Sequence, residues 1–265
     1  TVYFELCFQY LLSDSKGSSA AISTEVAILS MQRSMRGFRG PRDIFRNPEA
    51  AFRQFESTGG DSPFDLVLSH SGDSFAVMGM HFKIGLYEHQ SAGALQGLLN
   101  LVQQDPSIAV EPEKIKSIHI TAYEPAFGII GDPAKRDPKT RQSADHSMVY
   151  IVSAMLRKAQ DVAKQEGEGF FNQHNDEIWK RLMLTPYDFD VDAIFHPTSR
   201  AIMETISFEH GGKEYDDKYP DGIPTSMKIT LVDGTVLDSG FVMYPAGHAR
   251  NTTANLNDIL VEKFK

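Results

Sequence analysis

The chain has 265 residues, 41% of them hydrophobic, and a formal net charge of −9. These values are typical of a globular protein with one large domain or two modest ones, and the acidic balance argues against a nucleic-acid backbone as partner. No apolar run approaches the roughly 20 residues that cross a bilayer. Glu5 in the apolar opening segment argues against a signal peptide. Cys7 is the only cysteine in the sequence, which excludes an internal disulfide and an iron–sulfur cluster held by this chain's thiolates.

The first part of the chain carries helical patterns. Residues 18–38 place small and apolar residues at helical spacing and predict a helix that ends at Gly37, ahead of a proline. The stretch NPEAAFRQF predicts a second helix with Asn47 as its N-cap. The stretch ESTGGDSP, at 56–63, predicts a loop and a domain boundary. Because the chain opens without Met inside an apolar segment and closes on a short amphipathic pattern, we expect a fragment of a longer protein.

From about residue 74 onward, predicted helices and strands are mixed. HQSAGALQGLLNLVQQ predicts a helix, and IKSIHITAY alternates with period 2, as a strand does. One long helix is predicted from Ser143 to about Gln160, and another around DEIWKRLM. SRAIMETISFEH and SMKITLVDGTVLDSGFVMYP predict strands, the second a hairpin turning at Asp233-Gly234. The expected fold class is α+β with antiparallel strands, preceded by the end of an all-helical domain.

One group of polar residues lies where the long helix is predicted to begin. Ser143 as N-cap would place Asp145 and His146 in the first turn, where free backbone N–H groups favour anions. Asp145 alternatively complements the helix dipole and His146 is alternatively a half-buried structural histidine. The preceding loop adds cations that suit a polycarboxylate or form an ordinary solvated loop: Lys135, Arg136, Lys139 and Arg141.

A second group is MHFKIGLYEHQSAG, in which Lys83 and His89 flank a turn. The small residues that follow, Gly93 and Gly97 among them, allow another backbone or a ligand to come close, or simply serve helix packing. His81 and His89 are eight residues apart across a turn, which matches no reliable zinc spacing, so we predict no metal site.

A third group is YPAGHAR, after the last predicted strand, where His248 and Arg250 emerge beyond a turn at Gly247. A plain strand exit is the alternative. Each of the three segments offers a histidine with Lys or Arg nearby. If the fold brings the segments together, they form a cationic pocket capable of general acid–base catalysis.

The chain resembles the MmgE/PrpD family, and within it the methylcitrate-cycle dehydratases. The resemblance rests on FKIGLYEHQSAG, GDPAKRDPKTRQSADHSMVYIV, HPTSRAI and DGTVLDSGFVMYPAGHAR followed by LVEKFK. It implies a helical domain and a smaller α+β lid with the active site between them. Residues 1–70 would be the last helices of the helical domain, 71–245 the lid, and 246–265 a segment returning to the helical domain. Roughly the N-terminal half would be absent, so we expect the chain alone to be inactive.

The resemblance also implies a reaction and site residues. The reaction is dehydration of 2-methylcitrate to 2-methyl-cis-aconitate in propionate catabolism, without cofactor or metal, by a homodimer in the mitochondrial matrix or the bacterial cytoplasm. We assign proton transfer to His146, oriented by Asp145, with His89 as second candidate. Substrate binding is assigned to Lys83, Arg141, His248, Arg250 and Lys16. The alternatives are a cis-aconitate decarboxylase or other relative, and a non-catalytic lid or dimerisation fragment.

Overall fold

The computed structural model describes residues 14–40, 42 and 79–265, with side chains described from residue 18. The chain divides into two compact units, Thr1–Gly79 and Met80–Lys265. In the first unit, helix α2 (Asp14–Met35) confirms the helix predicted over 18–38. The helix predicted at NPEAAFRQF and the loop predicted at 56–63 lie outside the described residues. No helix in the described ranges is both long and apolar enough to span a membrane.

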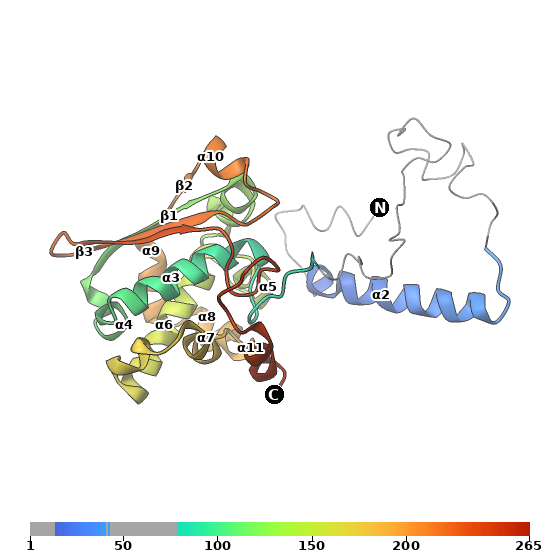
Figure 1. Cartoon of the computed structure of the whole chain (residues 1–265), viewed down its shortest axis with the longest axis horizontal. Helices are drawn as coiled ribbons and strands as arrows, with labels where there is room; N and C mark the ends of the chain where they lie inside the picture. Colours follow the sequence, from blue (N-terminus) through green and yellow to red (C-terminus); the bar gives the residue numbers. More distant parts are fainter. Residues whose placement is uncertain (1–13, 41, 43–78) are drawn as a thin grey trace. The chain divides into compact units, whose positions relative to one another are not determined.

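The second unit is built on a four-stranded sheet in the order β2-β1-β3-β4 (Figure 1). The strands are β1 (Ile115–Ala122), β2 (Ile206–His210), β3 (Thr225–Leu231) and β4 (Val236–Val242). The β3–β4 hairpin and the antiparallel pairing of β1 with β3 confirm the predicted pattern. The α+β class is therefore confirmed.

The prediction of antiparallel strands is wrong for β2, which pairs with β1 in parallel, Ile118 opposite Ile206. The connection between these two strands runs through helices, and a crossover of this kind returns the chain to the sheet in the same direction. The start of the stretch SRAIMETISFEH was also predicted wrongly, because its first part continues helix α9 (Pro197–Glu204). A proline at the first helical position and His196 accepting a bond from the Thr198 N–H start that helix.

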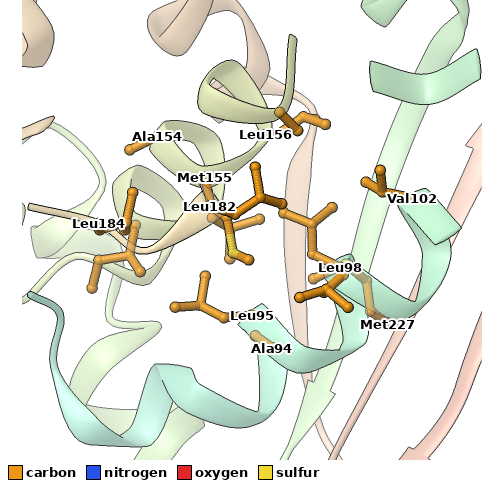
Figure 2. Close-up of a cluster of buried hydrophobic side chains, with 14 of the residues drawn as sticks. Ala94, Leu95, Leu98, Val102, Ala154, Met155, Leu156, Leu182, Leu184 and Met227 are labelled. Atoms are coloured by element: carbon orange, nitrogen blue, oxygen red, sulfur yellow. The ribbon is translucent and has the colours of Figure 1, made fainter. Parts of the chain in front are cut away.

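The core lies between the sheet and the helices on one of its faces (Figure 1). Helix α3 (Ala92–Gln104) packs on β3 and β4, and helix α6 (Met148–Glu166) packs on α3. Figure 2 shows Leu95, Leu98 and Val102 of α3 in one apolar cluster with Met155 of α6 and Met227 of β3. Burial of such side chains, at about 1.5–3 kcal/mol each, holds the layers together.

Shorter helices complete the second unit. They are α4 (Ser107–Val110), α5 (Arg141–Ala144), α7 (Asn175–Leu182), α8 (Val191–Ile194), α10 (Lys213–Asp216) and α11 (Leu256–Lys263). Helix α7 confirms the helix predicted around DEIWKRLM, and α11 packs against it. The return of residues 246–265 to a helical domain, like the other two predicted domain boundaries, stays a prediction.

One buried side chain ties the helical layer to the segment that follows β4. Gln96 Oε1, on α3, accepts hydrogen bonds from the Trp179 indole N–H at 2.9 Å and from the Ala246 N–H at 3.1 Å. Trp179 belongs to α7, so a single amide joins two helices and a loop. Because buried polar groups are costly when unpaired, this arrangement fixes the loop at Ala246 relative to the core.

The two glycines of α3 give a test of the contact between helix and sheet. A Cβ at Gly93 would lie 2.8 Å from the Ile223 carbonyl oxygen and overlap Thr225, so the close approach predicted for this helix is to another backbone. We expect Gly93→Ala to lower the free energy of unfolding by about 1–3 kcal/mol through overpacking. Denaturant unfolding of the purified chain measures it.

Gly97→Ala is the matched control. A Cβ there would meet Ser239 Oγ at 3.3 Å, and alanine gains up to about 1 kcal/mol of helix propensity over glycine. We expect this variant to stay within about 1 kcal/mol of the wild type or to be more stable. Equal losses in the two variants would contradict the packing described for α3.

Candidate active site

A backbone crossing joins two segments from opposite ends of the second unit. The Phe82 N–H donates to the Gly247 carbonyl oxygen at 2.8 Å. A Cβ at Gly247 would overlap the Phe82 carbonyl oxygen, so only glycine permits this approach. The crossing places residues 81–83 beside residues 247–250, and with them the histidines and cations of two predicted segments.

Three imidazoles stack at this crossing. The His81 ring lies 3.8 Å from the His248 ring, with 21° between their planes, and 5.7 Å from the His89 ring, with 7° between their planes. His248 is buried, whereas His81 and His89 are half-buried. The structure thus brings together the predicted residues His89 and His248 through His81, which the sequence-based assignment of the site omitted.

His81 and Lys83, like His248 and Arg250, are spaced by two residues in the sequence. This shared spacing does not place His81 at the site, because residues 248–250 form a bend and a turn rather than a strand. The tertiary contact that stacks the two pairs is not visible in either segment alone. From the sequence alone, His81 is either a surface residue or half of a metal pair with His89 that the spacing rejects. Among the residues that the structure describes, no group of three or more His, Cys, Asp or Glu side chains is placed to hold a metal ion.

Backbone N–H groups hold two of the rings. The Ala249 N–H donates to His81 Nδ1 and the Arg250 N–H donates to His248 Nδ1, both at 3.1 Å. The Tyr244 ring contacts the His248 ring, with centroids 4.9 Å apart. These contacts fix the orientation of both rings relative to the segment after β4.

Positive charge surrounds the stack. Lys83 and Arg250 are exposed, and Arg250 pairs with Asp221 at 3.0 Å. Lys263, from the last turn of α11, donates to the Lys83 carbonyl oxygen at 2.7 Å. Burial, and secondly the charge of Lys83, lower the pKa of Lys263. Lys263 is a second neighbour of the site that sequence analysis missed, because only the packing of α11 brings it there.

The pKa values of all three imidazoles are lowered. Burial is the main cause for each ring, followed by Arg250 for His81 and by His81 and Lys83 for His89. Burial, and then the two other imidazoles and Arg250, lower the pKa of His248 to about 4. At neutral pH the buried His248 is therefore uncharged.

The predicted start of the long helix at Ser143 is wrong. Thr140 caps the short helix α5, with Ser143 at its third position in a capping box, and Ser147 caps α6. The Ser147 hydroxyl also donates to the Lys135 carbonyl oxygen at 2.6 Å. Both serines suit an N-cap, but this loop contact selects Ser147, so Asp145 and His146 lie in the break between the two helices.

Asp145 and His146 form a dyad in this break. His146 Nδ1 contacts Asp145 Oδ1 and lies 3.1 Å from the Gln142 carbonyl oxygen. Two acceptors around Nδ1 place the proton of the neutral ring on that atom, so Nε2 carries the lone pair that can accept a proton. Asp145 is buried and His146 is half-buried. The arrangement resembles the carboxylate–imidazole pair of general bases.

The remaining predicted cations are Arg141, Lys16 and three residues of the loop before α5. Arg141 is exposed at the start of α5, and Lys16 lies in the first turn of α2, where its side chain is outside the described residues. In the loop before α5, Lys135 donates to the Ile129 carbonyl oxygen at 2.5 Å and Lys139 lies 3.4 Å from Asp137. Arg136 lies over the Phe208 ring. The contacts of these three loop cations agree with the structural alternative rather than with one anion pocket.

A model of the MmgE/PrpD C-terminal domain matches residues 87–265, more than half of the chain. The chain belongs to the MmgE/PrpD family. His89, the dyad, His248 and Arg250 lie inside the matched range, whereas His81 and Lys83 lie before it.

Two similar proteins are named as dehydratases. The mitochondrial 2-methylcitrate dehydratase of Yarrowia lipolytica is 29% identical over 196 residues, covering 72% of this chain and 32% of that protein. The 2-methylcitrate dehydratase of Cupriavidus necator is 42% identical over 53 residues, covering 20% of this chain and 11% of that protein. This MmgE/PrpD chain thus spans about a third of the first relative and less of the second.

The lowered pKa of His248 predicts acid sensitivity of this MmgE/PrpD chain. The ordinary histidine pKa is 6.5 and that of folded His248 is about 4, so the unfolded chain binds more protons between these values. This contribution to stability is fully present above pH 6.5 and is lost as the pH falls toward 4, by up to about 1.4 kcal/mol per pH unit.

The free energy of unfolding of the wild type and of His248→Asn, measured from about pH 4.5 to about pH 7.5, tests this. This interval covers most of the titration range of histidine. Asparagine keeps an acceptor for the Arg250 N–H but does not titrate. We expect a shallower pH dependence in this variant than in the wild type, because the group that titrates between the two pKa values has been removed. Identical slopes for wild type and His248→Asn would refute the uncharged state of the buried His248 ring.

Proposed function

We propose that the chain is the C-terminal, substrate-binding part of a hydro-lyase that dehydrates 2-methylcitrate to 2-methyl-cis-aconitate. The observation that carries the proposal is the stack of His81, His89 and His248 beside Lys83 and Arg250, in a chain of the MmgE/PrpD family. The names of the two similar proteins support a dehydratase and a tricarboxylate substrate.

The reaction has two barriers that these groups are suited to lower. A C–H bond next to a carboxylate is weakly acidic, and hydroxide is a poor leaving group. Lys83 and Arg250 on a substrate carboxylate stabilise the negative charge that develops when the C–H proton leaves. His248 presents an N–H donor, and Arg250 offers a planar fork for bidentate pairing with a carboxylate. We assign weaker binding roles to Arg141 and Lys16.

Proton transfer is assigned to the dyad and to His89. His146 Nε2 takes the C–H proton, while Asp145 orients the ring and stabilises the imidazolium that forms. The electron pair of the C–H bond becomes the new C=C bond as the C–O bond breaks. Protonated His89 gives its proton to the departing oxygen, which leaves as water. The proposal uses neither a metal nor a cofactor. It requires that the dyad and the stack face one substrate.

Because the chain spans about a third of the Yarrowia lipolytica relative, we propose that further segments complete the site and that the whole protein acts as a homodimer. We also propose a mitochondrial location, because that relative is named as a mitochondrial protein.

Replacement of the dyad tests the assignment in the complete enzyme. We expect His146→Ala to lower kcat for 2-methylcitrate dehydration by at least about 100-fold, since a general base contributes about 10²–10⁴-fold. Asp145→Asn should give a smaller loss, because the ring remains but its charged partner does not. The formation of the conjugated product, followed by ultraviolet absorbance, measures both.

His174→Asn is the control, since His174 is exposed, has no assigned role in the reaction, and caps α7 in a way that asparagine can also do. It should retain the wild-type kcat, and circular dichroism should show all three variants folded. Wild-type turnover by a folded His146→Ala enzyme would remove the dyad from the mechanism. Activity of the wild type on cis-aconitate with release of carbon dioxide, in place of 2-methylcitrate dehydration, would instead indicate a decarboxylase.

A further inference from the structure

The three stacked imidazoles differ in how their ring nitrogens are held. His81 Nδ1 accepts a hydrogen bond from the Ala249 N–H, and His248 Nδ1 accepts one from the Arg250 N–H. A backbone N–H donates and has no lone pair to offer, so Nδ1 carries no proton in either ring. The neutral rings therefore have their proton on Nε2. Protonation of either ring would break a backbone hydrogen bond of the segment after β4.

His89 lacks this restraint. The His89 ring stacks on His81, and the charge of Lys83 lies nearby. Within the described part of the chain, neither ring nitrogen of His89 takes part in a hydrogen bond. Protonation of His89 therefore breaks no backbone bond. Of the three rings, His89 is the one whose charge can change at the lowest structural cost.

The surroundings disfavour a second proton on the stack. Among the described residues, Lys83 and Arg250 carry positive charge near the rings, Lys263 lies beside Lys83, and Asp221 is engaged by Arg250. Two imidazolium rings 3.8 Å apart would repel each other strongly where water is excluded. The lowered pKa values of all three rings agree with this expectation.

We propose that His81 is a positioning residue that keeps His248 a neutral N–H donor and leaves His89 as the ring that exchanges a proton. His81 covers one face of His248, and its Nδ1 holds Ala249, the residue next to His248. His248 Nε2 is buried and has no hydrogen-bond partner among the described residues, so a bound oxygen atom would satisfy it. The use of this donor in catalysis rests on the proposed function, whereas the protonation states do not.

Ring-nitrogen NMR over a pH titration tests the proposal directly on the 265-residue chain. In the wild type we expect neutral His81 and neutral His248 to be Nε2–H tautomers, with His89 titrating at the highest pH of the three. A wild-type His248 that titrates above His89, or that carries its proton on Nδ1, would overturn the proposal.

Two variants of His81 separate its contributions. His81→Asn keeps an acceptor for the Ala249 N–H but removes the ring cover, so we expect the pKa of His248 to rise by about one unit or more. His81→Phe keeps the cover and removes the titratable ring, so a smaller rise is expected because burial is the main cause of the lowered pKa. His174→Asn is the control and should leave the pKa of His248 unchanged. An unchanged His248 pKa in folded His81→Asn would contradict the proposed role.

Activity of the complete enzyme distinguishes this inference from the proposed function. If His81 positions the donor, His81→Asn should shift the acidic limb of the kcat/KM profile while kcat at its plateau falls less than about tenfold. An unshifted limb in an active enzyme would overturn the positioning role. Ring titrations as predicted in an enzyme that does not dehydrate 2-methylcitrate would overturn the proposed function and leave the positioning role standing.

Discussion

The hydrogen bond between the Phe82 N–H and the Gly247 carbonyl oxygen is the contact on which the candidate site depends. It joins segments about 165 residues apart in the sequence, at a place with no room for a side chain on residue 247. This crossing brings the His81 and His248 rings close enough to stack. The arrangement of the site therefore follows from the close contact of two backbone segments, and not from the local sequence around any one histidine.

The core of the second unit makes that approach possible. Gln96 on the buried helix α3 holds both Trp179 of α7 and the Ala246 N–H, one residue before the crossing. Helix α11, which packs on α7, brings Lys263 to the Lys83 carbonyl oxygen. The apolar layer between sheet and helices therefore positions the two segments of the site. A loss of packing in α3 should also displace His248.

Local patterns predicted much of the fold. Alternation identified β1 and the β3–β4 hairpin, and apolar spacing identified α3, α6 and α7. The parallel pairing of β2 was not predictable from its five residues, because the direction of a strand depends on the crossover before it. Ser143 and Ser147 are equally good caps in sequence, and only the contact with the Lys135 carbonyl oxygen separates them. His81 and Lys263 escaped notice for the same reason, since tertiary contacts alone place them at the site.

The central claim is that the crossing builds a binding site for a polycarboxylate. A crystal structure of the complete protein with propane-1,2,3-tricarboxylate, which has no hydroxyl to eliminate, tests it most directly. The account predicts a carboxylate oxygen within about 3 Å of His248 Nε2, a second carboxylate on Lys83 or Arg250, and His146 Nε2 facing the carbon chain. A ligand bound away from the three stacked imidazoles, or a dyad that faces a different cavity from the stack, would contradict it.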